Sequence, residues 1–341
     1  MGRYTAAMFS GAQCLVTGGT GFIGRYVVRR LLAHGAKVRM SCRSHVKARR
    51  LFGDTVELGD SCRGIDVVFH LAGVYQFGRR AIAEMFAANV RGTEALLEAV
   101  WAARVERFVH ISSSGVLACN GAPITERSFP DSVSPREPYR RTKWLGELAA
   151  LAAAKRGLPV TIGSPTSPLG AEDETPTPTG RIVADFVGGR FPFSTRTALN
   201  FVDVAELADG ILALAECGCT GERYILGHHN VWLTEFLRVL ERCADLPAPR
   251  RELPWPVVAI AGGVGEALGA SRVCWETART ARKRQFFDLR KAADELGWQG
   301  RVPLEASARA AVAWFCQRTE CAPVVLAPLG AGQAETNVAA S

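Results

Sequence analysis

Cys14-Leu15-Val16-Thr17-Gly18-Gly19-Thr20-Gly21-Phe22-Ile23-Gly24 is the stretch that decides the fold of this 341-residue chain. Its apolar start predicts a strand, and the apolar spacing over residues 27–32 predicts a helix directly after it. The glycines serve a tight turn, a close approach of pyrophosphate to the backbone, and close packing of helix on sheet, in that order. Because a helix N-terminus offers free N–H groups, we expect a dinucleotide site that includes Gly18, Gly21, Phe22, Ile23 and Gly24.

The composition bounds the class of protein. Hydrophobic residues make up 48% of the chain, as in a globular enzyme. No apolar run reaches the ~18 residues of a membrane span, and the first dozen residues lack a secretory core. Of the ten cysteines, only Cys217 and Cys219 are close together, without a second pair to complete a metal site. We therefore expect free thiols, no metal, no transmembrane segment and a cytoplasmic location.

The charge balance favours small-molecule chemistry over nucleic acid. The net charge is +8, with arginine clusters at 43–50 and 279–284. Neither an aromatic-interleaved platform nor a helix-turn-helix pattern accompanies these clusters, so we expect no nucleic-acid partner.

Strands and helices alternate as far as residue 163. The sequence predicts strands at 37–42, 56–58, 66–71, 107–112 and 160–162, and helices at 82–103 and 139–155. This rhythm is typical of an α/β fold with a doubly wound parallel sheet, a Rossmann domain over residues 12–163 whose core could recruit later strands. Residues 164–318 form a smaller, mostly helical substrate-binding region, and residues 319–341 read as a disordered tail.

A tyrosine and a lysine carry the predicted chemistry. Tyr139 and Lys143 are four residues apart in a helical stretch, so they share one face. An ammonium beside a phenol stabilises the phenolate, which turns a weak base into a useful one. The serine run 112–114 ends the strand before them, and a serine hydroxyl can orient the reacting oxygen. These groups can move a proton while a hydride moves to or from a nicotinamide.

Together, these motifs resemble the extended short-chain dehydrogenases/reductases over about residues 13–315. The resemblance rests on residues 17–24, Asp60, 70–73, 89–93, 112–114 and 139–143. It implies a nicotinamide cofactor and a serine–tyrosine–lysine catalytic set, with Tyr139 as acid/base and Lys143 holding the ribose and lowering the tyrosine pKa. Ser114, third in its run, is the first choice for the serine and Ser113 the second.

The same resemblance assigns further cofactor contacts. Asp60 would meet the adenine, and Ala72 and Gly73 would line the phosphate and nicotinamide-ribose path. Asn89 would support the strand ends, although a buried asparagine bonded only to backbone is an equal alternative.

Segments of the second half are similar to a narrower group. Residues 176–182, 199–202, 221–227 and 281–287 resemble dihydroflavonol-reductase-like proteins called hopanoid-associated sugar epimerases, which are related to 3β-hydroxysteroid dehydrogenases and sterol C4 decarboxylases. The label implies a polycyclic-triterpenoid setting, within lipid or sterol metabolism.

The end of the second strand bears on cofactor choice. NAD-preferring relatives carry an acidic residue there, whereas this chain has Cys42 followed by Arg43, with Lys47 and Arg49 close behind. Arg43 could bind a 2′-phosphate, so we expect NADP or NAD with NADP favoured. A solvated Arg43, with both cofactors accepted, is the alternative.

Three functions remain open. An apolar stretch at 255–264, with Phe186, Phe191, Phe193, Trp232 and Trp275 in the same half, favours a secondary alcohol or ketone on a hydrophobic polycyclic substrate, possible C4 decarboxylation included. Helix packing or transient membrane contact could equally explain that stretch.

The second function is an NAD-dependent nucleotide-sugar epimerase/dehydratase. The stretch 163–168 lacks the asparagine that many such epimerases use there, although four arginines could serve a diphosphate: Arg181, Arg196, Arg223 and Arg284. The third is a non-catalytic nucleotide sensor or lipid carrier, against which the intact tyrosine counts.

We also expect a homodimer that pairs through the helices at 82–103 and 139–155.

Overall fold

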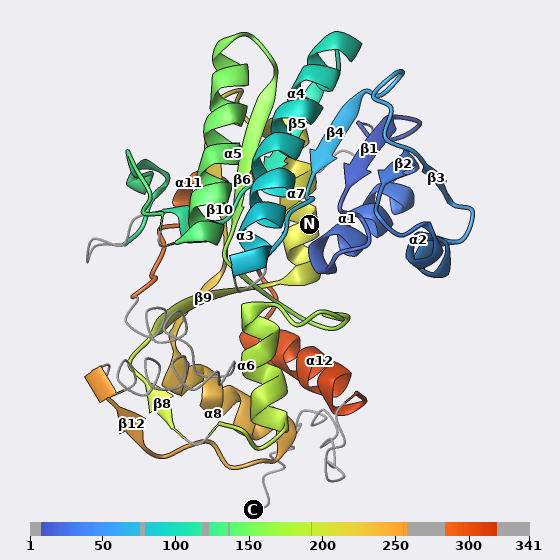
Figure 1. The fold of residues 1–341 in the computed structure, drawn as a ribbon. Coiled ribbons are helices and arrows are strands. Elements are labelled where there is room, and N and C mark those ends of the chain that lie inside the picture. Colours follow the sequence, from blue (N-terminus) through green and yellow to red (C-terminus); the bar gives the residue numbers. More distant parts are fainter. Residues whose placement is uncertain are drawn as a thin grey trace, which may run out of the picture.

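The computed structural model describes residues 8–75, 79–117, 123–135, 137–191, 193–254, 256–257 and 284–318. Its larger part is built on a seven-stranded, wholly parallel sheet in the order β10-β6-β5-β4-β1-β2-β3 (Figure 1). The strands are β1 (Gln13–Thr17), β2 (Lys37–Ser41), β3 (Val56–Leu58), β4 (Val67–His70), β5 (Arg107–Ile111), β6 (Val160–Pro165) and β10 (Arg223–Leu226). The predicted doubly wound α/β fold class is confirmed.

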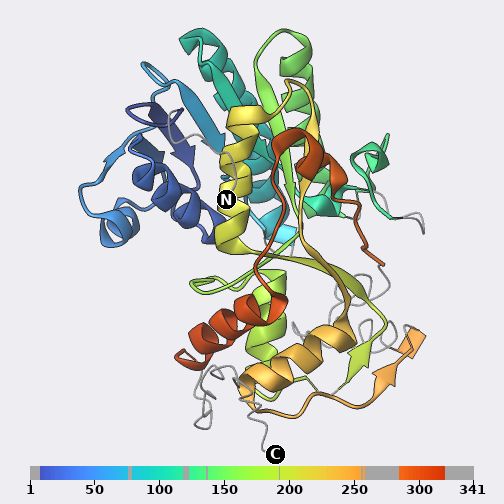
Figure 2. The ribbon, with the colours of Figure 1, turned by 180° about the vertical axis from the view of Figure 1, so that it is seen from behind.

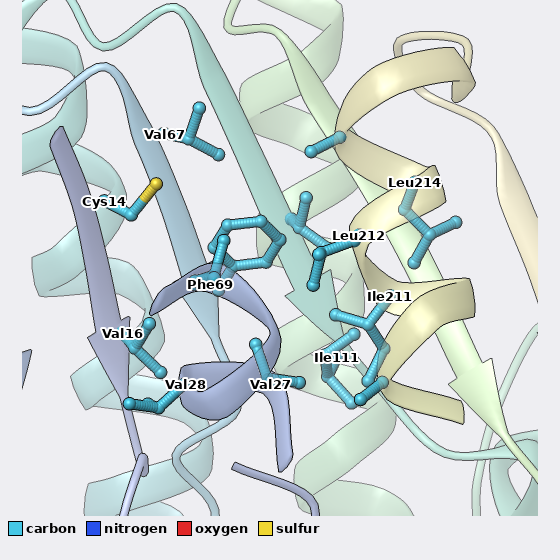
Figure 3. Packing of buried hydrophobic residues seen from close by; sticks show 14 of the residues in the cluster. Cys14, Val16, Val27, Val28, Val67, Phe69, Ile111, Ile211, Leu212 and Leu214 are labelled. Atoms are coloured by element: carbon cyan, nitrogen blue, oxygen red, sulfur yellow. The ribbon is translucent and has the colours of Figure 1, made fainter. Parts of the chain in front are cut away.

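Helices cover both faces of this sheet. One face carries α1 (Phe22–Ala33), α2 (His45–Phe52) and α7 (Val204–Cys217), and the other carries α4 (Gly92–Ala103) and α5 (Pro138–Lys155). On the first face, Val27 and Val28 of α1 and Ile211 and Leu212 of α7 gather around Phe69 of β4 (Figure 3). These apolar side chains are fully or almost fully buried, which fixes where each strand ends relative to the helices.

The helix expected at 82–103 is interrupted. The chain forms α3 (Arg79–Phe86), then a π-helical turn over Ala87–Arg91, and then α4. The π-turn contains Asn89, and such turns recur at functional sites.

The seventh strand comes from the later half of the chain. β10 lies beside β6, and α11 (Arg290–Leu296) packs against β10 and α7. The main sheet thus includes a strand from beyond residue 163. The predicted boundary between the Rossmann domain and the substrate-binding region at residues 163/164 stays a prediction.

The smaller part lies at the carboxyl ends of the strands (Figures 1 and 2). It contains a three-stranded sheet of β7 (Ser167–Leu169), β9 (Ala198–Asp203) and β11 (His229–Trp232), and a short pair of β8 (Ser194–Thr195) and β12 (Glu252–Leu253). Helices α6 (Pro178–Val187), α8 (Leu233–Ala244) and α12 (Leu304–Cys316) enclose its own core. Phe186 is 3% exposed within that core, so it packs the region rather than lining a cleft.

Some expectations fall outside the described residues. They are the apolar stretch at 258–264, Trp255, Trp275 and the tail at 319–341. Within the described residues, no helix is long and apolar enough to cross a membrane.

Candidate active site

The glycine loop between β1 and α1 has the shape that its sequence predicts. Gly18 adopts φ +73°, and a Cβ there would lie 2.7 Å from the Ala72 nitrogen. A Cβ on Gly24 would lie 2.8 Å from the Cα of Gly19, so helix and loop touch at this point. Gly21 differs, since it is exposed and a Cβ would meet only the Gly18 carbonyl oxygen, at 3.2 Å. The loop therefore fits a dinucleotide: two glycines are required by the fold, and the third keeps the outer surface open.

A buried arginine that the sequence did not point to is hydrogen-bonded to the backbone of this loop. Arg25 of α1 is only 2% exposed, and its guanidinium donates to the carbonyl oxygens of Thr20 and Gly21, each at 3.4 Å. Glu172 and Glu174, in the segment between β7 and α6, pair with it at 3.4 and 3.3 Å. An arginine in a helix ordinarily indicates a solvated face, so the sequence carried no signal for this contact.

The tyrosine and one serine meet at the carboxyl edge of the sheet. Tyr139 lies in the first turn of α5, where its phenol comes near the hydroxyl of Ser113, which follows β5. Burial raises the pKa of Tyr139, and the Ser113 hydrogen bond opposes that rise. Ser114, the first choice from the sequence, instead begins the short 3-10 turn Ser114–Val116 and is buried there. The geometry therefore favours Ser113, because the chain turns away immediately after it.

Lys143 lies one helical turn beyond Tyr139, as predicted. Its Nζ donates to the backbone oxygen of Ile111 at 2.6 Å, and its side chain is buried. Burial lowers the pKa of Lys143 to about 8, although the Glu147 carboxylate opposes this shift. The lowering of the Tyr139 pKa by Lys143, which the family resemblance implies, stays a prediction.

Asn89 ties the loop after β4 to α5. Its Oδ1 accepts from the Val74 nitrogen at 2.7 Å, while its Nδ2 donates to the Val74 oxygen and the Thr142 Oγ1, both at 3.0 Å. Gly73 lies in this loop, where a Cβ would come within 3.4 Å of the Asn89 Oδ1 and 3.8 Å of the Lys143 Nζ. Asn89 thus bonds to more than backbone, and it brings Gly73 close to Lys143.

Thr17 fixes the other side of the same loop. Its Oγ1 lies 2.7 Å from the Nδ1 of His70 and accepts from the Ala72 nitrogen at 3.2 Å. Burial lowers the pKa of His70 to about 3, so the imidazole is a neutral structural group. Ala72 and Gly73 are therefore held beside the glycine loop.

The residues assigned to the adenosine end lie at the surface. Arg43 is exposed just after β2, and Asp60 is exposed after β3. The Gly18 nitrogen donates to the Ser41 oxygen at 3.3 Å, so the end of β2 adjoins the glycine loop. Lys47 pairs with Glu174 at 2.8 Å and Arg49 with Asp54 at 2.7 Å. Of the three basic residues considered for a 2′-phosphate, Arg43 is the one for which no partner is found within the described part of the chain.

A second missed residue lies one turn beyond Lys143. Glu147 is fully buried, accepts from the Ser112 hydroxyl and forms an ion pair with Arg223 of β10. Its spacing of four from Lys143, and of eight from Tyr139, places all three on one face and could have revealed it. Because Arg223 forms this ion pair, it is not free to bind a substrate diphosphate, the role that the sequence analysis considered for it.

These features belong to a known group of enzymes. The sequence pattern of the NAD dependent epimerase/dehydratase family matches residues 14–227. The chain belongs to this family. Members are extended short-chain dehydrogenases/reductases, so the enzyme class predicted from the motifs is confirmed and the activity is NAD-dependent at the level of the family.

Relatives of this epimerase/dehydratase family member carry different activities in their names. It is 33% identical over 331 residues, 89% of this chain and 95% of the other, to a putative dihydroflavonol 4-reductase of Synechocystis sp.. Over 254 residues, 70% of this chain and 77% of the other, it is 33% identical to the sterol demethylase protein B of Methylococcus capsulatus. A crystal structure described as a nucleoside-diphosphate-sugar epimerase from Pseudomonas aeruginosa superposes with a TM-score of 0.75 at 27% identity, covering 90% of this chain and 98% of that one.

Proposed function

We propose that this protein is an NAD(P)-dependent dehydrogenase/reductase of a secondary alcohol or ketone on a hydrophobic polycyclic substrate of the sterol or hopanoid kind. The observation that carries the reaction type is the closeness of the Tyr139 phenol to the Ser113 hydroxyl, with Lys143 one turn away at the edge where the glycine loop opens. Similarity to a sterol demethylase protein supports the substrate class.

Each residue of the site has its own role in the proposed reaction. Tyr139 exchanges the hydroxyl proton of the substrate, and Ser113 donates a hydrogen bond to the same oxygen. Lys143 donates to the nicotinamide ribose and supplies positive charge beside the phenol. A nicotinamide held by these residues would supply the hydride-transfer chemistry. The glycine loop holds the pyrophosphate, and Ala72 and Gly73 line the path between the two ends.

A carboxylate on the substrate would extend the reaction. Oxidation of an alcohol two carbons from a carboxylate gives a β-keto acid, in which the ketone can accept the electron pair of the breaking carbon–carbon bond. Carbon dioxide then leaves and the resulting enolate takes up a proton, so no further catalytic group is needed. C4 decarboxylation is therefore compatible with the same three residues.

We favour NADP over NAD as the cofactor. Arg43 follows β2 at the position where an acidic residue would select the ribose of NAD, and it is exposed. Because Lys47 and Arg49 are paired with carboxylates, the preference would depend on Arg43.

We also propose a homodimer that joins the α4 and α5 faces of two copies. Ile82, Phe86 and Trp101 are 39–43% exposed on the helical run from α3 to α4, and the guanidinium of Arg156, which directly follows α5, lies 5.2 Å from the Trp101 ring. Large apolar side chains gathered on an outer face favour burial against a partner.

A nucleotide-sugar epimerase is the second candidate. The similar crystal structure named as such an epimerase favours it, and Arg196 and Arg284, which lie 5.5 and 6.0 Å from the Trp232 ring, offer positive charge in the smaller part.

A substrate panel separates the two. Purified protein is mixed with NAD or NADP and either 3β-hydroxysterols, with and without a C4 carboxylate, or nucleotide sugars, and the absorbance of reduced nicotinamide is followed. Net reduction with a sterol supports the dehydrogenase. Interconversion of a sugar nucleotide without net reduction would replace it by the epimerase.

A further inference from the structure

Two contacts join β5 to α5 directly beneath the proposed catalytic groups. The Lys143 ammonium donates to the Ile111 carbonyl oxygen, and the Ser112 hydroxyl, one residue later, donates to Glu147. Lys143 and Glu147 are four residues apart, on adjacent turns of one helix face. The strand end that carries Ser113 is thus fastened to the helix that carries Tyr139.

Glu147 is an unusual residue for this position. It is 0% exposed, and a buried carboxylate is costly unless it is paired and hydrogen-bonded. The Nε of Arg223 forms the ion pair with Glu147. Two further contacts hold the arginine in place: its Nη1 donates to the Glu126 backbone oxygen at 3.0 Å, and its guanidinium lies 4.0 Å from the Phe129 ring. The pair is therefore built into β10, α5 and the turn at Glu126–Ser128.

Among the described residues, two buried histidines and one carboxylate interact electrostatically with Lys143. His70 of β4 and His110 of β5 face it, and burial together with the lysine charge keeps the pKa of both well below the ordinary value, so both are neutral. Tyr139 lies on its own helix, with a raised pKa. The carboxylate of Glu126 lies at the far side of Arg223 and accepts from the Ile225 nitrogen at 3.0 Å. Glu147 is the anion that acts on Lys143.

We propose that the buried Glu147–Arg223 pair acts through Lys143: the Glu147 carboxylate favours the charged form of the Lys143 ammonium, and Arg223, which pairs with Glu147, weakens that effect. Both are positioning residues, because neither lies where cofactor or substrate would touch it. The proposal builds on the role of Lys143 given above, but it concerns a charge that can be measured without substrate.

The two partners should shift Lys143 in opposite directions. Glu147→Gln keeps the shape and the acceptor oxygen but leaves two cations in the buried cluster, which disfavours the ammonium. Arg223→Met leaves Glu147 and Lys143 alone together, which favours it. A purely structural pair would weaken folding in both variants without this opposition of sign.

Nuclear magnetic resonance of protein labelled with ¹³C at the lysine ε-carbon measures the charge directly. The chain has six lysines, and the Lys143 signal is the one lost in Lys143→Met. The signal should titrate at about 8 in the wild type. It should titrate about one unit or more lower in Glu147→Gln and higher in Arg223→Met.

The outcomes are separable. The proposal would be overturned if the titration midpoint of Lys143 stayed unchanged in both variants, or if it shifted in the same direction in both. If Glu147→Gln does not fold, Arg223→Met alone tests the upward shift, and Glu147→Gln/Arg223→Met should return toward the wild-type value. Opposite shifts of Lys143 without any matching change in the pH dependence of NADPH affinity would leave this inference standing and remove Lys143 from the proposed cofactor site.

Discussion

The Ser113 hydroxyl and the Tyr139 phenol come close together at the junction of β5 and α5, although the two residues are 26 positions apart in the sequence. The Ser113 Oγ also accepts from the Gly115 nitrogen at 3.1 Å, which leaves its own proton free to donate. A hydroxyl with a free proton beside the phenol can donate to a substrate oxygen, and this supports our proposal that Ser113 has the serine role.

Ser113→Ala should lower turnover by about 10- to 100-fold, because one hydrogen bond to the reacting oxygen is lost. Ser114→Ala is the matched control, since Ser114 is buried in the following turn. Steady-state rates at saturating cofactor decide between them. Loss of turnover in Ser114→Ala with normal turnover in Ser113→Ala would return the role to Ser114.

Gly21→Val should abolish dinucleotide binding while the protein stays folded. Gly21 is exposed and has an ordinary extended backbone (φ −76°, ψ 175°), and a Cβ there would meet only the Gly18 carbonyl oxygen at 3.2 Å, so the rest of the valine side chain would extend into the place of the pyrophosphate. Titration of reduced-nicotinamide fluorescence should show a loss of about 100-fold or more in affinity, with the circular dichroism unchanged. Unchanged affinity would show that the loop binds another ligand.

Arg43→Ala should raise the KM for NADPH by about tenfold and leave the KM for NADH nearly unchanged, because only the former loses a charge-assisted contact. Arg49→Ala provides the control, since Arg49 already pairs with Asp54. A wild-type enzyme with a clear preference for NADH, or equal effects of both substitutions, would count against NADP.

Glu174→Gln should destabilise the protein near neutral pH by about 1 kcal/mol, a modest value because the carboxylate is partly exposed. Hydrogen bonding with Lys47 lowers the pKa of Glu174 to about 2, below the value near 4.5 of an unfolded chain. Its contribution is therefore present above pH ~4.5 and is lost as the pH falls toward 2. Urea unfolding of wild type and variant should differ at pH 7 and converge near pH 2–3.

Asp54→Asn is the control for that comparison. Asp54 pairs with Arg49 at 2.7 Å, but its side chain is 97% exposed. Its substitution should change stability little at either pH, whereas an effect as large as that of Glu174→Gln would mean that the segment at 172–174 is not specially held.

The local geometry that the sequence predicted well is the geometry that follows from short spacings. Glycines at 18, 21 and 24, and the four-residue interval from Tyr139 to Lys143, each fix a local geometry that no tertiary contact altered. Runs of buried apolar residues likewise predicted the strands of the sheet, because a strand covered on both faces has little other composition available.

The residues that the sequence missed depend on contacts distant along the chain. Arg25 is buried by Glu172 and Glu174, nearly 150 positions away, and Glu147 is buried by Arg223 of β10. Charged residues in amphipathic helices ordinarily point to solvent, so only the folded arrangement reveals the burial of Arg25, whereas the spacing of Glu147 from Lys143 offered a signal that went unused. The choice between Ser113 and Ser114 depended on where β5 stops, which the pattern fixes only to within a residue or two.

Turnover by Tyr139→Phe, measured together with its affinity for NADPH, tests the central claim most directly. With a 3β-hydroxysterol that the wild type oxidises, the variant should reduce the nicotinamide about 10²- to 10⁴-fold more slowly, while its dissociation constant for NADPH stays within about threefold of the wild type. Near-normal turnover in Tyr139→Phe would contradict the assignment of Tyr139 as the group that exchanges the substrate proton.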